Sequence, residues 1–130
     1  MNVGDVASRS GLPAKTIRYY EEIGLVSPAR AGNGYRAYSN EDVHRLAFLK
    51  RARSLGFSIE ECRQLLQLYG DKSRASHDVQ QIAVSHVRAI EDKIRELESM
   101  RATLQKLIAA CHGDHRPDCP ILEDIAGASA

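Results

Sequence analysis

The sequence lacks most of the features that identify a membrane, secreted or repeat protein. Its 130 residues contain no tryptophan, few aromatic residues (5%) and four prolines. No apolar run approaches the ~18 residues that cross a bilayer, and no basic segment followed by an apolar one opens the chain. Repeats and low-complexity stretches are also absent, so glycine, proline and serine must mark the boundaries between elements. We therefore expect a soluble, cytoplasmic protein.

Cysteine and net charge are equally sparse. Three cysteines are an odd number, and a reducing cytoplasm favours thiolate chemistry over a disulfide framework. A formal net charge of +1 argues, taken alone, against nucleic-acid binding. The two halves differ, however: residues 1–60 carry nine Lys and Arg against six Asp and Glu, and residues 61–130 carry nine against eleven. A basic front and an acidic rear predict two tasks in one chain.

The first forty residues predict a winged helix-turn-helix. The apolar residues at the start share one helical face, and Gly11 ends that stretch. A second helix follows, because Pro13 suits a first turn and Gly24 suits an end. Two short helices joined by a tight turn form a helix-turn-helix unit. The Asn33 and Gly34 pair is a strong hairpin signal and predicts the wing.

Serine capping signatures predict two more helices. Ser39 is followed by Asp42, and Ser58 by Glu61, which is the pattern of a capping box. The second of these helices is expected to stop at Gly70. Cys62 falls on its apolar side and is predicted to be a small core residue.

The longest segment without glycine or proline runs from about residue 79 to residue 110. Its apolar residues follow the 3-4-3 spacing of a coiled-coil seam, with Arg101 at the one position that breaks it. The apolar positions are Val87, Ile90, Ile94, Leu97, Leu104 and Ile108. A rod of about 45 Å is too long for this chain to cover alone, so we expect a homodimer that places two heads on one DNA. The alternative is a helix packed back on its own head.

Candidate DNA contacts lie in the second helix and the hairpin. Lysine and arginine pair with phosphates or guanine edges, and tyrosine hydroxyls reach the backbone. The candidates are Lys15, Thr16, Arg18, Tyr19 and Tyr20 in the helix, and Arg30, Tyr35 and Arg36 on the wing. For Tyr20, as for Tyr38, packing in the core is the favoured interpretation.

Cys111 and Cys119 flank a turn near the end of the chain, and two thiolates from one loop suit a soft metal. Pro120 predicts that Cys119 is the N-cap of a short last helix. The loop alone leaves the metal open. Two sulfurs suit a linear Cu(I) ion, whereas His112 and His115 would complete a four-ligand site for a divalent ion such as Zn²⁺.

The runs TIRYYEEIGL, NGYRAY and LGFSIEE occur in the order typical of the N-terminal DNA-binding region of MerR-family transcription regulators, which this chain closely resembles. The resemblance extends through the long helix to the C-terminal loop. It implies a dimer with an antiparallel coiled coil, bound to double-stranded promoter DNA where RNA polymerase engages. Drug-sensing members carry a large extra ligand domain for which this chain has no room, which leaves the short metal- or redox-sensing members.

Residues 110–121 match the loop pattern A-C-x-G-D to D-C-P-I of copper-, silver- and gold-sensing CueR-type members. Zinc- and mercury-sensing members carry a third cysteine at the head of the long helix, and Ser76 occupies that position here. Because serine is a poor ligand for a soft cation, the resemblance implies Cu(I) as effector, with Ag(I) or Au(I) as alternatives, and Ser76 as a selectivity position. The other interpretation of Ser76 is an ordinary helix N-cap.

The prediction is a mainly α-helical protein: a winged helix-turn-helix DNA-binding domain over residues 1–70, a connector over 71–78, a dimerisation helix over 79–110, and a metal-binding loop and tail over 111–130. Its expected function is a copper-responsive activator that distorts promoter DNA to switch on copper-efflux or detoxification genes. The alternatives are a zinc- or cadmium-type regulator and a copper-carrying protein. An enzyme is not expected, because no residue arrangement supplies an orienting group and an oxyanion hole.

Overall fold

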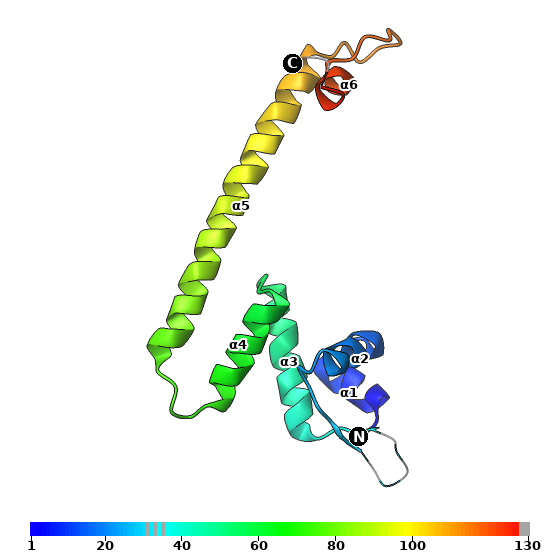
Figure 1. The fold of residues 1–130 in the computed structure, drawn as a ribbon. Helices are drawn as coiled ribbons and strands as arrows, with labels where there is room; N and C mark the ends of the chain where they lie inside the picture. The colour runs from blue at the N-terminus through cyan, green and yellow to red at the C-terminus, as the bar shows by residue number, and fades with distance from the viewer. Residues whose placement is uncertain (31, 33, 35, 128–130) are drawn as a thin grey trace. The chain divides into compact units, whose positions relative to one another are not determined.

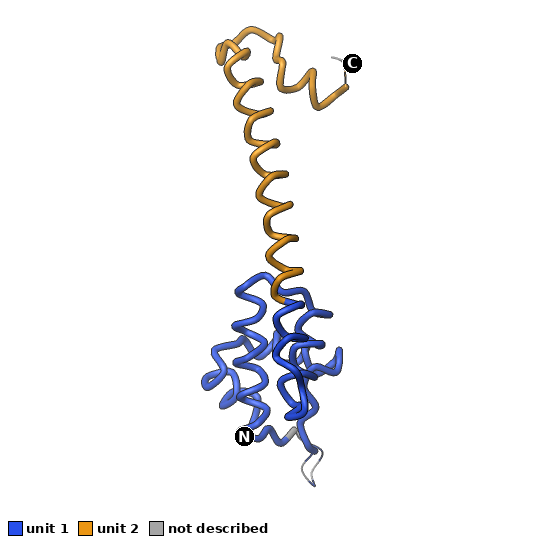
Figure 2. Tube along the Cα trace, turned by 90° about the vertical axis from the view of Figure 1, so that its left-hand side faces the viewer, with its two compact units in different colours: residues 1–82 blue, residues 83–130 orange. Residues whose placement is uncertain are grey.

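The computed structural model describes residues 1–30, 32, 34 and 36–127 (Figure 1). Apart from one short hairpin, its elements are helices, which confirms the predicted fold class. They are α1 (Val3–Ser10), α2 (Ala14–Glu22), β1 (Ala29–Arg30), β2 (Arg36–Ala37), α3 (Asn40–Ser54), α4 (Ile59–Gly70), α5 (Ser76–Ala110) and α6 (Pro120–Ile125). The chain divides into unit 1, residues Met1–Ile82, and unit 2, residues Ala83–Ala130 (Figure 2). In the part of the chain that the structure describes, no helix combines the length and apolar character needed to span a bilayer.

Local side-chain signals begin three of the helices. In a capping box the N-cap side chain accepts from the backbone N–H three residues on, and that residue's side chain accepts from the N-cap N–H. The boxes pair Asn2 with Asp5 in α1, Ser39 with Asp42 in α3 and Ser58 with Glu61 in α4. The two serine boxes were predicted. Between α1 and α2, Gly11 has φ of 77°, a left-handed conformation that glycine adopts without a Cβ clash.

Unit 1 contains the hydrophobic core. Helix α1 packs on α2 and α3, and α4 packs on α3 (Figure 1). The buried hydrophobic residues are Val6, Ile17, Tyr20, Leu25, Val26, Tyr38, Leu46, Leu49, Ala52, Cys62 and Leu66. The core therefore includes Cys62, Tyr20 and Tyr38, and core packing was the favoured prediction for each of them. It also joins the two helices of the helix-turn-helix, through Val6 of α1 and Ile17 and Tyr20 of α2.

The predicted hairpin is present between α2 and α3. Strands β1 and β2 pair antiparallel, with Ala29 opposite Ala37 and Arg30 opposite Arg36. Asn33, part of the predicted turn, and Tyr35, a predicted wing contact, lie outside the described residues. The main chain of Met1 pairs with that of Tyr38 just after β2, so the start of the chain supports the base of the wing.

Helix α5 begins earlier than predicted. It starts at Ser76, three residues before the expected residue 79, so the connector is shorter than 71–78. Asp78 lies in its first turn, where the positive end of the helix dipole favours a carboxylate. Ser76 is accordingly the first helical residue and not the N-cap. Before it, the Asp71 carboxylate accepts hydrogen bonds from the Ser73 N–H (2.9 Å) and Oγ (2.6 Å). These bonds lower the pKa of Asp71.

Candidate DNA-binding surface and cysteine loop

Helix α2 presents a mixed polar face to solvent. Ile17 and Tyr20 are buried and anchor the helix in the core, while Lys15, Arg18 and Tyr19 are exposed. Because residues three and four apart share a helical face, burying 17 and 20 directs 15, 18 and 19 elsewhere. This is the helix that would enter a major groove in a helix-turn-helix protein.

A shallow cavity of about 350 Å³ lies beside these side chains. Its lining residues are Lys15, Thr16, Tyr19, Tyr20, Arg53 and Ile59. Four of the predicted DNA contacts therefore meet at one place. Tyr20 has a buried ring but still forms part of the wall, so core packing and a place at this surface are compatible for it.

Arg53 is the residue that sequence reasoning missed. It lies in the last turn of α3, and its guanidinium donates to the Phe57 carbonyl at 2.6 Å. Burial raises the pKa of the Tyr20 hydroxyl, while the charge and hydrogen bond of Arg53 partly oppose that rise. The cavity thus holds a second cation beside Lys15, and a planar guanidinium suits a phosphate. The signal in the sequence was the basic run Lys50, Arg51, Arg53.

The two arginines of the wing have different surroundings. One guanidinium nitrogen of Arg30 lies 3.7 Å from a Glu21 carboxylate oxygen, and the other donates to the Gly34 carbonyl at 3.3 Å. The other oxygen of Glu21 accepts from the Tyr38 hydroxyl at 3.3 Å. Arg36 is placed by its strand, directly opposite Arg30.

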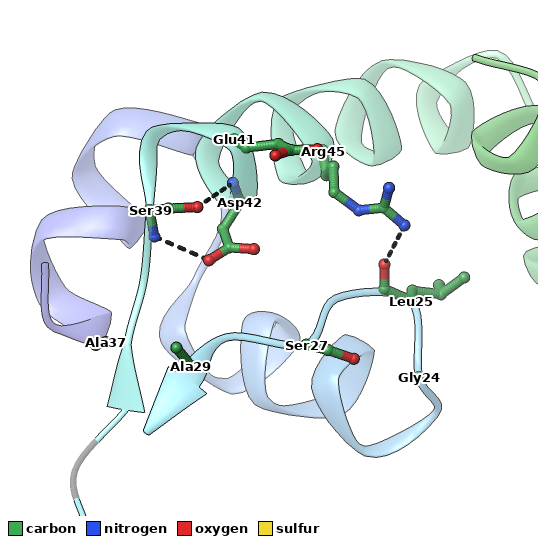
Figure 3. Close-up of a pocket in the computed structure, with 9 residues that line it drawn as sticks. All are labelled: Gly24, Leu25, Ser27, Ala29, Ala37, Ser39, Glu41, Asp42 and Arg45. Atoms are coloured by element: carbon green, nitrogen blue, oxygen red, sulfur yellow. Dashed lines mark hydrogen bonds between the residues drawn. The ribbon is translucent and has the colours of Figure 1, made fainter. Parts of the chain in front are cut away.

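A second hollow, of about 400 Å³, lies behind the wing between the loop after α2 and the start of α3 (Figure 3). In Figure 3 the Asp42 carboxylate accepts from the Ser39 N–H at 2.8 Å, and Arg45 donates to the Leu25 carbonyl at 3.2 Å. These polar groups start α3 and hold the loop that leads into β1. We assign this hollow a structural role.

The two predicted metal ligands begin and end one loop in unit 2. Cys111 directly follows α5, and its N–H donates to the Leu107 and Ile108 carbonyls at 3.1 Å each. Cys119 is the N-cap of α6, with Pro120 as first helical residue, as predicted. Both are free thiols and both are half-buried. Helix ends on both sides therefore fix the backbone of the two sulfur-bearing residues.

The donor chemistry of this loop fits a soft metal ion. Two sulfurs are the ligands that such an ion prefers. His112 and His115 are exposed, and between them the Asp114 carboxylate accepts from the Arg116 backbone N–H at 2.9 Å. Among the described residues, no three His, Cys, Asp or Glu side chains gather as a metal-binding group. Ser76 belongs to unit 1, at the start of α5.

Comparison with known proteins agrees with this architecture. Residues 1–69 match the family described as MerR HTH family regulatory protein, and residues 43–107 match the one described as MerR, DNA binding. The HTH-type transcriptional regulator HmrR of Rhizobium leguminosarum bv. viciae is 62% identical, over 97% of this chain and 98% of its own. The HTH-type transcriptional regulator CueR of Salmonella typhimurium is 45% identical, over 98% of this chain and 93% of its own. These names describe transcription regulators.

A solved structure is also similar over nearly the whole chain. The transcription regulator PbrR691 from Ralstonia metallidurans CH34, in complex with lead(II), superimposes with a TM-score of 0.85 at 28% identity, covering 96% of this chain and 98% of that one. The fold and surface define a helix-turn-helix DNA-binding protein with a long C-terminal helix. The chain belongs to the MerR family of helix-turn-helix regulatory proteins.

Proposed function

We propose that this protein is a metal-responsive transcription activator whose effector is Cu(I), with Ag(I) and Au(I) as alternatives. The observation that carries the proposal is the pair of half-buried free thiols, Cys111 and Cys119, which begin and end one loop between two helices. Two thiolates provide a low coordination number that a monovalent d¹⁰ ion accepts, whereas divalent ions prefer about four ligands. The match to CueR and the serine at position 76 support the same choice.

The head would bind promoter DNA through α2 and the wing. Lys15, Thr16, Arg18 and Tyr19 would contact the groove and its phosphates, Tyr20 would support them, and Arg53 would add a cation. The cavity that most of these residues line, and the exposure of Arg18, support this proposal. The proposed wing contacts are Tyr35 and Arg36, with Arg30 beside them. In this division of the chain, residues 1–70 would bind DNA, residues 71–75 would connect, helix α5 (Ser76–Ala110) would dimerise, and residues 111–130 would hold the metal.

A homodimer would place two heads on one operator. Helix α5 has no buried residue in the single chain, and its seam positions are exposed to between 41% and 61%. A partner helix would remove this apolar row from water. The dimer would hold the promoter in a bent, undertwisted shape that RNA polymerase can use, so that part of the energy lies in deforming DNA.

Metal capture would act on this assembly through the protein's own residues. Cys111 and Cys119 would hold the ion, which would supply a link between the two ends of their loop, and α5 would pass the resulting change to the heads. Ser76 contributes by supplying no third sulfur. Because coupling between two sites is reciprocal, the activating DNA shape must raise the affinity of the two cysteines for the metal.

A divalent-metal regulator is the second candidate. The favouring observation is the similarity to the lead(II)-bound PbrR691 structure, together with His112 and His115 in the loop. This function requires the two exposed histidines to turn toward the thiols.

X-ray absorption of the reduced protein, titrated with Cu(I) in competition with Zn(II), tests the proposal. We expect two sulfur ligands on copper, no firm zinc binding, and loss of the copper signal in Cys111→Ser and in Cys119→Ser. His112→Ala and His115→Ala are matched controls that leave the copper spectrum unchanged. A zinc site with nitrogen ligands that these histidine variants abolish would replace Cu(I) with a divalent ion.

A further inference from the structure

The Glu21 carboxylate joins the end of α2 to the wing. One of its oxygens lies 3.7 Å from an Arg30 guanidinium nitrogen, and the other accepts from the Tyr38 hydroxyl at 3.3 Å. Tyr38 is buried in the core, so the position of the carboxylate is set from inside the head. The Arg30 guanidinium also donates to the carbonyl of Gly34, which lies between β1 and β2. Glu21 therefore holds the wing through a side chain that the core itself orients.

The position of Glu21 is unfavourable without these contacts. Glu21 lies in the last turn of α2, which contains no basic residue, and the negative end of a helix dipole repels a carboxylate. Arg30 and Arg36 also occupy paired positions in the ladder of β1 and β2, and like charges at paired positions destabilise a strand pair. The ion pair between Glu21 and Arg30 reduces both the repulsion of Glu21 by the helix dipole and the repulsion between the two arginines.

Glu21 and Arg30 differ in solvent exposure, as expected if Glu21 fixes the position of Arg30. The Glu21 side chain is 15% exposed and the Arg30 side chain 58%. The largely buried Glu21 carboxylate has little freedom to move, so it restricts the more exposed Arg30 side chain that it contacts. Arg36 occupies the position on β2 that is paired with Arg30.

We infer that Glu21 is a positioning residue for DNA binding: acting through Arg30, it fixes the wing against the recognition helix so that Arg36 is presented to phosphate. Arg30 then serves to hold the wing, not to contact DNA itself. The inference rests on the proposed DNA-binding function of the head. A wing that is already fixed loses less conformational freedom on binding, which raises affinity without a new contact.

A double-mutant cycle on the full-length protein tests the inference. The probe is a mixed-sequence DNA duplex of about three helical turns at one fixed salt concentration, because phosphate contacts dominate such binding. Glu21→Gln keeps the shape and an acceptor for Tyr38, and Arg30→Met keeps the length of the side chain. We expect each to weaken binding about threefold, the range of an exposed ion pair, and the double variant also about threefold, because both remove the same contact.

Glu22→Gln is the matched control. It removes the same charge from the neighbouring, exposed position of α2, so it should leave binding unchanged or slightly tighter. Tyr38→Phe is the second variant, since it removes one tie to Glu21 and leaves every charge in place; it should weaken binding in the wild type but not in Glu21→Gln. Thermal unfolding of each variant shows whether the head remains folded.

The outcomes separate the inference from the function beneath it. Additive losses, about ninefold in the double variant, would show that Glu21 and Arg30 act independently and overturn the inference. An effect of Glu21→Gln equal to that of Glu22→Gln would do the same. A wild-type protein that fails to bind the duplex would instead remove the DNA-binding proposal itself.

Discussion

The three cysteines differ in how far solvent reaches them. Cys62 is fully buried in the head, and its thiol donates a weak hydrogen bond to the Phe57 carbonyl at 3.9 Å. Burial raises the pKa of the Cys62 thiol, which keeps it neutral. Cys111 and Cys119 are half-buried at helix ends. Helical spacing predicted the core role of Cys62, because residues 59, 62, 65 and 66 share a face. No local pattern predicts how close the two loop sulfurs lie.

This contrast predicts selective alkylation. With the reduced, metal-free protein near neutral pH, iodoacetamide should modify Cys111 and Cys119 and leave Cys62 intact, because the reactive form is an accessible thiolate. Mass spectrometry of tryptic peptides measures the result. In concentrated urea all three should react, which controls for intrinsic reactivity. Rapid modification of Cys62 in the folded protein would mean that the head opens on the timescale of the reaction.

Helix boundaries were the most predictable elements, because they depend on residues three or four apart. The serine boxes and the glycine stops placed α1 to α4 within a residue or two. Elements that depend on distant residues were not predictable. The cavity beside Lys15 requires Arg53 from the end of α3, and the support of the wing requires Glu21 beside Tyr38. The early start of α5 was missed because a serine-rich polar stretch is as typical of a connector as of a first helical turn.

Removing a capping box should destabilise the head by a modest amount. Ser39→Ala deletes the acceptor for the Asp42 N–H, seen at 3.2 Å, and leaves the buried Asp42 carboxylate with half of the box. We expect a loss of about 1 kcal/mol in the free energy of unfolding, measured by urea denaturation. Ser8→Ala, at an exposed position within α1, is the matched control and should cost little. Equal effects of the two substitutions would show that the box adds nothing to stability.

At the scale of the whole molecule, helix α5 is the element that the single chain leaves incomplete. It is 35 residues long and none of its residues is buried. Its apolar row runs from Val87 to Ile108, close to the cysteine loop. Exposure of this apolar row to water is unfavourable. Each Å² of apolar surface that a partner helix buries would stabilise the dimer by about 25 cal/mol. Arg101 interrupts the row at one position and is exposed. In a parallel pair the two arginines would meet in one layer, so the interruption favours an antiparallel partner.

The test of this dimer is a charge placed in the centre of the row. Leu97 is 54% exposed in the single chain, and Leu97→Asp would bury two uncompensated carboxylates in a dimer. Burial of an unpaired charge costs several kcal/mol, so we expect the dimer dissociation constant to rise by about a hundredfold or more, measured by sedimentation at several concentrations. Ser99→Asp adds the same charge two residues away, on another face of α5, and should remain dimeric. If Leu97→Asp sediments as the wild type does, the row does not form the interface. If it dissociates, duplex DNA binding should weaken with it, because two heads no longer engage one duplex together.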